Sequence, residues 1–213
     1  MMLKYLFRID THALCAWIGK SAMMRTAEKK VHIMNQMNAE KAFARLKEGS
    51  RRYISSSFNP GNISREIRIE TAEHGQHPYA VIVACSDSRE IPEDIFTCGI
   101  GEIFTVRVAG NVIGENQLGS IEYAVEHLGI ELVVVLGHTG CGAVGASLKG
   151  ETGGHVSSIT RDIIQAIGNE KKALEASILN TVYQAHKVKE AFPDVTTVPA
   201  LYDIHSGEII WLE

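Results

Sequence analysis

Three short runs of apolar residues in the middle of the chain predict the centre of the fold. They cover residues 79–84, 102–108 and 131–136 and are rich in Val and Ile. Apolar and polar positions do not alternate along them, which is the pattern of strands covered on both faces. The sequence therefore predicts three buried strands of a largely parallel sheet.

Helix signals fill the segments around these runs. Asn38 suits the N-cap of a first helix, because its side-chain oxygen can accept a hydrogen bond from a free backbone N–H. Glycines placed just past the periodic stretches are expected to end the helices. The expected helices are NAEKAFARLKE with Gly49 just past its end, a second one through Glu73 closed by Gly75, 117–128 closed by Gly129, and a long region from about Ser157 to Ala191 broken near Gly168.

The order of these elements predicts the fold class. Strand, connection, strand, helix, strand and helix is typical of an α/β domain with a central, mostly parallel β-sheet flanked by helices. ALYDI and EIIWL, joined by a short polar turn, predict a C-terminal edge hairpin. Residues 1–37 are expected to be an N-terminal helical arm or extension before a catalytic domain at 38–213, and Met23, Met24 or Met34 could be the true start.

Composition narrows the classes of function. The 213 residues are 45% hydrophobic and 22% charged, as in an ordinary globular protein. The formal net charge of -4 and the lack of a basic stripe argue against a nucleic-acid partner. No run approaches the roughly 20 apolar residues of a membrane span, and the N-terminus is a poor signal-peptide core. No membrane partner and a cytoplasmic location are therefore expected.

Three side chains with metal-binding chemistry stand where two of the apolar runs stop. Cys85 follows the first run, and His138 and Cys141 follow the third. Because ligand sites of parallel sheets lie at the carboxyl ends of strands, these side chains are expected to meet. Two thiolates and one imidazole suit Zn²⁺ with a fourth position open. Core packing is the alternative for each one alone, and Cys15 and Cys98 fit no ligand role.

The segment after the first of these cysteines adds a carboxylate and a guanidinium, Asp87 and Arg89. An adjacent positive charge lowers the pKa of a carboxyl group, so Asp87 is expected to stay ionised. It could accept a hydrogen bond from a metal-bound water, or it could occupy the fourth metal position itself. The alternative is a surface ion pair at a strand–helix turn.

A glycine pattern at residues 140–145 offers a different enzyme class. It formally matches G-x-G-x-x-G, which cradles a dinucleotide pyrophosphate after a strand. The glycines start late after the strand, and no second strand ending in an acidic residue follows about 20 residues on. The context therefore argues against a dinucleotide.

Taken together, the motifs resemble the beta-class carbonic anhydrases. CSDSR beside an apolar strand and GHTGCGAV downstream carry the resemblance, which extends from about Asn38 to Leu212 through GQHPYAVIVACSDSR, GEIFTVRVAGNV, GSIEYAVEHLG and ALYDIHSG. The resemblance implies zinc held by Cys85, His138 and Cys141, with Asp87 and Arg89 as the catalytic dyad. It implies reversible hydration of carbon dioxide to bicarbonate and a proton by attack of zinc-bound hydroxide, with Asp87 as a fourth ligand in a closed state.

The resemblance also implies substrate contacts and an assembly. Gln76 would donate a hydrogen bond to the substrate across a dimer interface, and the backbone N–H of Gly142 would point at a substrate oxygen. Phe104, Ala109 and Tyr123 would form the apolar wall around CO₂. Family members form homodimers or larger assemblies such as homotetramers, in which residues 1–37 could embrace the partner.

One position departs from some family members, and two alternatives keep the same metal. Ile82 stands where some members carry a tryptophan of an inhibitory bicarbonate site, so that regulation is not expected here. The alternatives are hydrolysis of carbonyl sulfide or carbon disulfide, and a zinc-binding protein closed permanently by Asp87. His155, in a glycine-rich loop, is the first choice for a proton shuttle.

Overall fold

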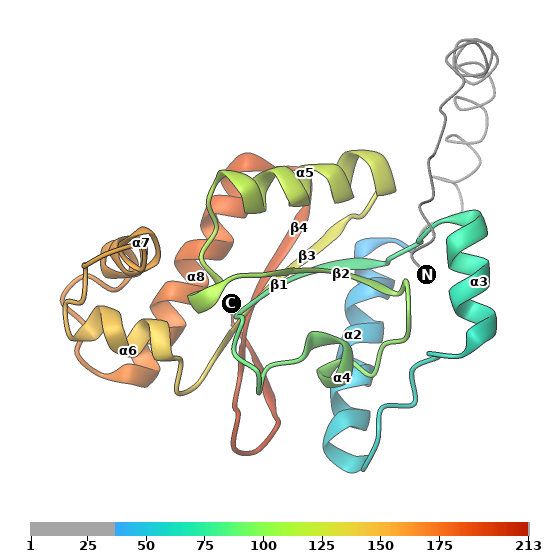
Figure 1. Ribbon diagram of the computed structural model, residues 1–213, viewed down its shortest axis with the longest axis horizontal. Helices are drawn as coiled ribbons and strands as arrows, with labels where there is room; N and C mark the ends of the chain where they lie inside the picture. The colour runs from blue at the N-terminus through green and yellow to red at the C-terminus, as the bar shows by residue number, and fades with distance from the viewer. Residues whose placement is uncertain (1–36, 213) are drawn as a thin grey trace, which may run out of the picture. The chain divides into compact units, whose positions relative to one another are not determined.

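Five strands in the order β2-β1-β3-β4-β5 form one sheet at the centre of residues 37–212, the part of the chain described by this computed structural model (Figure 1). The first four strands are parallel, and the last pairs antiparallel with its neighbour. The strands are β1 (Ala80–Ala84), β2 (Ile103–Arg107), β3 (Leu132–His138), β4 (Thr196–Tyr202) and β5 (Ile209–Trp211). The predicted mostly parallel sheet with an edge hairpin is confirmed.

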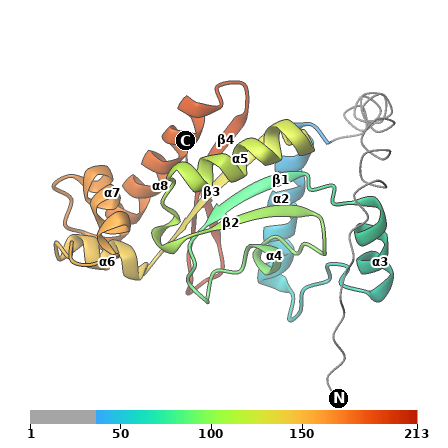
Figure 2. The ribbon, with the colours of Figure 1, turned by 45° about the horizontal axis from the view of Figure 1, so that its top comes forward.

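Helices cover both faces of this sheet (Figures 1 and 2). They are α2 (Ala39–Ser55), α3 (Arg65–His74), α4 (Pro92–Ile95), α5 (Glu115–Leu128), α6 (Gly142–Leu148), α7 (Ser157–Ile167) and α8 (Ala173–Ala191), with a 3₁₀ turn η1 at Ala109–Asn111. Helices α5 and α8 pack on one face, and α2 and α4 pack on the other. Both faces of the central strands are therefore buried.

Successive side chains of β1 point to opposite faces of the sheet. Because both faces are buried, the sequence of β1 shows no alternation of apolar and polar residues. Val81 and Val83 pack into the core beneath α5 and α8, whereas Ala80, Ile82 and Ala84 pack into the core beneath α2 and α4. All five residues are fully buried. The continuous apolar run is the consequence, as expected for a central parallel strand.

Helix α2 corrects one sequence expectation, because it runs through Gly49 and ends only at Ser55. Gly49 does not end a helix. A Cβ atom at this position would lie 2.1 Å from the carbonyl oxygen of Phe96, the residue that follows α4. The glycine therefore lets the backbone of α2 approach that of the α4 segment closely.

Other predicted helix ends agree with the structure. The Asn38 side chain caps α2 by accepting a hydrogen bond from the backbone N–H of Lys41 at 3.0 Å. Gly75, Gly129 and Gly168 follow α3, α5 and α7 with positive φ angles of 87°, 68° and 55°. Among the described residues, no helix combines the length and apolar character needed to cross a membrane.

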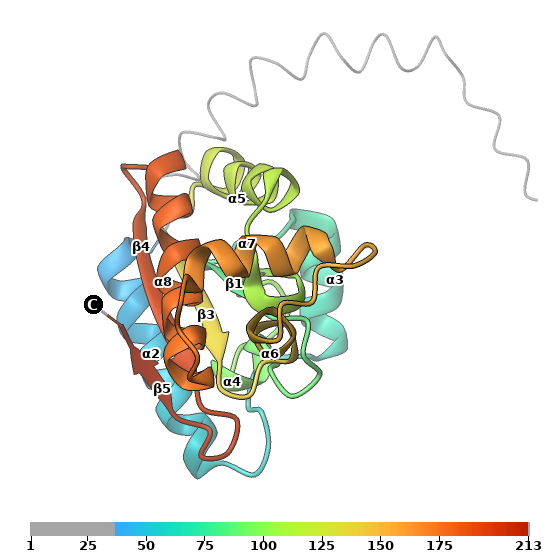
Figure 3. The same ribbon diagram turned by 90° about the vertical axis from the view of Figure 1, so that its left-hand side faces the viewer.

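Helices α6, α7 and α8 gather beside the carboxyl ends of β1 and β3, where Figure 3 shows them in the foreground. Their apolar side chains form a third buried cluster with Cys85 and Cys141. Residues 1–36, which make up nearly all of the expected arm and include Cys15 and the three alternative start methionines, lie outside the described residues.

Candidate metal centre

Cys85, His138 and Cys141 meet at the carboxyl ends of two neighbouring strands. Cys85 directly follows β1, His138 is the last residue of β3, and Cys141 immediately precedes α6. Their potential ligand atoms lie within 4.8 Å of one another, and all three residues are buried. The parallel pairing of β1 with β3 therefore brings together the three residues that the sequence singled out.

The hydrogen bonds of His138 leave one ring nitrogen free for a ligand. Its Nδ1 lies 3.0 Å from the carbonyl oxygen of Thr139, to which it donates a hydrogen bond. Its Nε2 is buried and has no hydrogen-bond partner. Metal-binding histidines are commonly fixed in this way, with the second nitrogen donating to a carbonyl group. A buried, unpartnered nitrogen beside two sulfur atoms thus fits a metal ion.

The two sulfur atoms influence each other strongly. The hydrogen bond from Cys141 lowers the pKa of Cys85 far below its ordinary value. The same contact, followed by burial, raises the pKa of Cys141. The contact between the two sulfurs therefore shifts their pKa values in opposite directions, whereas a divalent cation favours both as thiolates.

A backbone N–H also points at this centre. The N–H of Gly110 donates to the Cys85 sulfur at 3.1 Å. Gly110 has a φ of 70°, and a Cβ atom there would lie 2.7 Å from Ile163. Both facts require glycine at this position in the turn after β2.

Asp87 lies beside the cluster and is held by Arg89. The guanidinium donates from Nε to Oδ1 at 2.9 Å and from Nη2 to Oδ2 at 2.8 Å. These hydrogen bonds hold the pKa of Asp87 well below its ordinary range. Its Oδ2 is 3.9 Å from Nε2 of His138, so an ionised carboxylate faces the cluster without belonging to it.

The proposed substrate residues divide into two groups. Gly142 directly follows Cys141 in the chain, and Ala109 precedes Gly110, whose N–H donates to the Cys85 sulfur, so both lie near the metal cluster. Phe104 and Tyr123 contact each other, with 6.3 Å between their ring centroids. Phe104 pairs with Val81, near the amino end of β1, at a distance along the strand from the cluster.

Gln76 and His155 are not brought to the cluster within one chain. Gln76 is exposed and precedes β1, whereas Cys85 follows this strand. His155 is exposed in the loop before α7, where its carbonyl oxygen accepts a hydrogen bond from Ser158. The roles predicted for both residues stay predictions.

Two residues near the centre were missed by the sequence analysis. Glu90 is fully buried, and its Oε2 accepts a hydrogen bond from the backbone N–H of Cys85 at 2.9 Å. Burial raises the pKa of Glu90 to about 8. Arg107, at the end of β2, donates from Nε to the carbonyl oxygen of Cys85 at 2.9 Å. The sequence feature that could have identified both residues is a charged residue within or next to an apolar segment of the core.

Comparisons with known proteins agree on one family. A family model described as "Carbonic anhydrase" matches residues 80–209. Curated proteins named carbonic anhydrase 2, from Mycobacterium tuberculosis, and carbonic anhydrase, from Mycolicibacterium smegmatis, are each 42% identical over 135 and 136 residues. Each match covers 63% of this chain and 65% of the relative, so the chain matches less than two thirds of their length.

Solved structures give the same result for the fold. A beta-carbonic anhydrase of Aspergillus fumigatus is 25% identical, with a TM-score of 0.60 over 70% of this chain and 81% of that one. A tetrameric beta-carbonic anhydrase of Sordaria macrospora is 24% identical, with a TM-score of 0.59 over 70% and 87% of the two chains. The resemblance identified in the sequence is confirmed.

Proposed function

This chain belongs to the carbonic anhydrase family, and on that premise we propose that it catalyses the reversible hydration of carbon dioxide to bicarbonate and a proton. The observation that carries the proposal is the buried cluster of Cys85, His138 and Cys141, with the Asp87 carboxylate facing it. The activity of the relatives, which is stated by their names, supports the same reaction.

We propose Zn²⁺ as the ion that the cluster holds, with Cys85, His138 and Cys141 as its ligands. Two sulfur donors and one imidazole match the ligand preference of zinc, and three protein ligands are typical of a catalytic rather than a structural site. When bound, zinc would supply a Lewis acid that makes a coordinated water acidic near neutral pH.

Asp87 would orient the attacking water. Because Arg89 keeps it ionised, the carboxylate can accept a hydrogen bond from a water near His138 and donates none. Arg89 also donates to the carbonyl oxygen of Gly140 at 3.4 Å, so it links the Asp87 turn to the loop that carries Cys141. The pair thereby fixes the acceptor relative to the cluster, which is the role of a preorganised catalytic group.

The substrate contacts proposed for the other residues depend on whether each residue lies beside the metal cluster or away from it. Gly142 begins α6, where a free backbone N–H is available to an oxygen atom of bicarbonate. Ala109 offers a small apolar surface beside the cluster. Gln76, Phe104 and Tyr123 would serve the active site of a second subunit, because they lie away from the cluster of their own chain.

The proposal therefore includes assembly into a homodimer or homotetramer. Helix α3 buries none of its residues, and Ile63 and Phe58 near it are each 71% exposed. Such apolar surface is typical of an interaction site. One solved relative is described as tetrameric. The cytoplasmic location expected from the sequence stays a prediction.

The alternatives differ in substrate or in access to the metal. In the structure Asp87 is bound by Arg89 rather than grouped with the three ligands, which supports an open site over a permanently closed one. Carbonyl sulfide and carbon disulfide would need the same catalytic groups, so turnover of each substrate must be compared directly.

The deciding experiment combines stopped-flow CO₂ hydration across pH with metal analysis of the same sample. We expect about one zinc per chain and turnover that rises with pH, because the attacking species forms by loss of a proton. The Cys141→Ala variant should lose both metal and turnover, while Cys98→Ala should keep both, because Cys98 lies outside the cluster. Zinc without CO₂ hydration at any pH, or faster turnover of carbonyl sulfide, would contradict the proposal.

A further inference from the structure

The backbone of Cys85 is held on both sides by the side chains of Glu90 and Arg107. Its N–H donates to Oε2 of Glu90 at 2.9 Å, and its carbonyl oxygen accepts from Nε of Arg107 at 2.9 Å. Cys85 lies one residue beyond β1, where pairing within the sheet has stopped. At Cys85, two side chains therefore make the backbone hydrogen bonds that neighbouring strands provide for Ala84.

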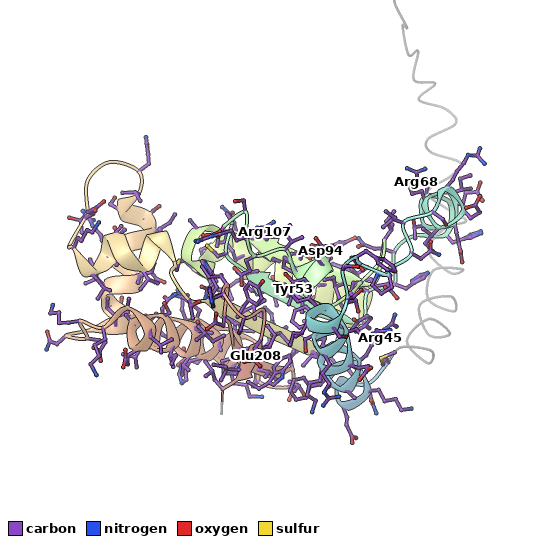
Figure 4. The ribbon with its side chains drawn as sticks, turned by 90° about the horizontal axis from the view of Figure 1, so that it is seen from below. Arg45, Tyr53, Arg68, Asp94, Arg107 and Glu208 are labelled. Carbon is purple, nitrogen blue, oxygen red and sulfur yellow. The ribbon has the colours of Figure 1, made fainter. Side chains whose placement is uncertain are left out.

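Arg107 ties down the rest of the same turn. Its Nη2 donates to the carbonyl oxygen of Asp87 at 2.7 Å and to that of Glu90 at 2.8 Å. In Figure 4, Arg107 is labelled to the left of Asp94, whereas Arg45 on α2 and Arg68 on α3 lie on the right. One guanidinium thus connects the residue that would bind the metal with the residue that would orient the water.

If Glu90 served only to fill the core, an apolar residue at this position would give a more stable fold. Glu90 is 0% exposed, and its second oxygen, Oε1, has no hydrogen-bond partner. An unpartnered buried polar atom destabilises the fold, and an apolar residue of similar size avoids that penalty. The carboxylate is therefore better explained by the hydrogen bond that it makes than by core packing.

We propose that Glu90 is a positioning residue, which fixes the Cys85 backbone and thereby aims the Cys85 sulfur at His138 and Cys141, with Arg107 as its counterpart on the carbonyl side. This inference rests on the proposed function only in taking Cys85 as a metal ligand. Partners that orient metal ligands typically contribute 10–100-fold to metal affinity.

The test compares two substitutions of Glu90 in the full-length protein. Glu90→Met keeps an unbranched side chain but removes the acceptor, whereas Glu90→Gln keeps a carbonyl oxygen that can accept from Cys85 N–H. Zinc affinity is measured by competition with a chromophoric chelator, and ligand geometry by the absorption of the Co²⁺-substituted protein. We expect Glu90→Met to weaken zinc binding at least about 10-fold and to change the Co²⁺ spectrum, and Glu90→Gln to stay within about threefold of the wild type.

Two further variants separate positioning from general effects on the core. Thr197→Val is the matched control, because it also removes a buried unpartnered oxygen, on β4 five residues before the strand partner of His138. It should leave zinc affinity unchanged. Arg107→Met changes an exposed side chain and loses only the three carbonyl contacts, so it should weaken zinc binding even if Glu90→Met does not fold.

The possible results separate this inference from the proposed function. Zinc affinity within twofold of the wild type in both Glu90→Met and Arg107→Met would overturn the positioning role while leaving CO₂ hydration by the wild type intact. Equal losses in Glu90→Gln and Glu90→Met, or in Thr197→Val, would also overturn it. A wild-type protein that binds zinc tightly without hydrating CO₂ would contradict the proposed function and leave the positioning role testable.

Discussion

Arg89 holds the Asp87 carboxylate by three hydrogen bonds, two from its guanidinium at 2.9 Å and 2.8 Å and one from its own backbone N–H at 3.0 Å. The carboxylate cannot rotate without breaking these bonds. Its Oδ2 consequently stays 3.9 Å from Nε2 of His138, facing the candidate metal centre. If the centre holds zinc as proposed, a fixed, ionised acceptor beside it would orient a water for attack on a small electrophile.

The Asp87→Asn variant tests this pair. The amide NH₂ cannot accept from the guanidinium, so the acceptor facing the centre loses both its charge and its orientation. We expect zinc content to stay unchanged and kcat for CO₂ hydration to fall about 10²–10⁴-fold. Stopped-flow hydration with metal analysis measures both, and Asp94→Asn, on α4, is the matched control. Wild-type kcat in Asp87→Asn would remove this residue from the mechanism.

Two of the helical glycines, Gly49 in α2 and Gly119 in α5, should respond to alanine in opposite ways. In α2, a methyl group at Gly49 would collide with the backbone of Phe96, which cannot move aside as a flexible side chain can. We expect Gly49→Ala to lower the free energy of unfolding by about 1–3 kcal/mol. In α5, Gly119 has open space, so Gly119→Ala should be neutral or stabilise by up to about 1 kcal/mol. Urea denaturation measures both, and equal effects would contradict the close approach.

Gly49 also shows where prediction from the sequence stops. The local pattern could show that a glycine stands near the end of a periodic stretch, which is typical of a helix end. It could not show that Phe96, 47 positions later, packs against this glycine. Close approaches between distant segments depend on the tertiary fold, so the same residue type has two interpretations that the sequence alone does not separate.

The metal centre was more predictable than its supports. Cys85, His138 and Cys141 lie at or shortly after the carboxyl ends of buried strands, and the geometry of parallel sheets brings such positions together. Glu90 and Arg107 carry no motif of this kind, because their role depends on hydrogen bonds to the backbone of Cys85. Gln76 and Phe104 are assigned by family resemblance alone, since a single chain does not place them at the cluster.

Alkaline stability should depend on the buried pair of Tyr79 and Cys98, whose Oη and Sγ atoms lie 3.1 Å apart. Burial raises the pKa of Tyr79 well above its ordinary value and that of Cys98 to about 11. Above a pH of about 10, the unfolded state therefore loses the tyrosine proton while the folded state keeps it. The unfolded state then binds fewer protons, so stability falls as pH rises, by up to about 1.4 kcal/mol per pH unit for one such group.

The Tyr79→Phe variant isolates this effect. At neutral pH it should lose about 1 kcal/mol with the hydrogen bond to Cys98. Between about pH 9 and about pH 11, its Tm should fall less than that of the wild type, because phenylalanine has no proton to lose. Tyr123→Phe is the control, because Tyr123 is 48% exposed, and it should follow the wild type. An identical fall in Tm for Tyr79→Phe and the wild type would show that Tyr79 does not contribute.

Gln76 lies four residues before β1 and Cys85 directly follows it, and this five-residue strand spans about 16 Å. If Gln76 contacts the substrate, it does so in the active site of a second subunit. A heterodimer of one Gln76→Ala chain and one Cys85→Ala chain, purified with two different tags, tests this arrangement. It should contain one complete site, because the Gln76→Ala chain keeps its metal ligands and would receive Gln76 of the partner subunit. We expect about half of the wild-type turnover per dimer.

The matched control carries the same two substitutions on one chain and pairs that chain with the wild type. Its only metal site lies on the wild-type chain, which would now face an alanine in place of the partner's Gln76. Action across the interface therefore predicts that this control has the lower turnover, with the loss appearing in kcat/KM for CO₂ because the missing group contacts the substrate. Action within one chain predicts the reverse order, since the wild-type chain would then supply both its metal ligands and Gln76. Because both heterodimers contain the same substitutions, a difference in stability or zinc content cannot mimic this reversal.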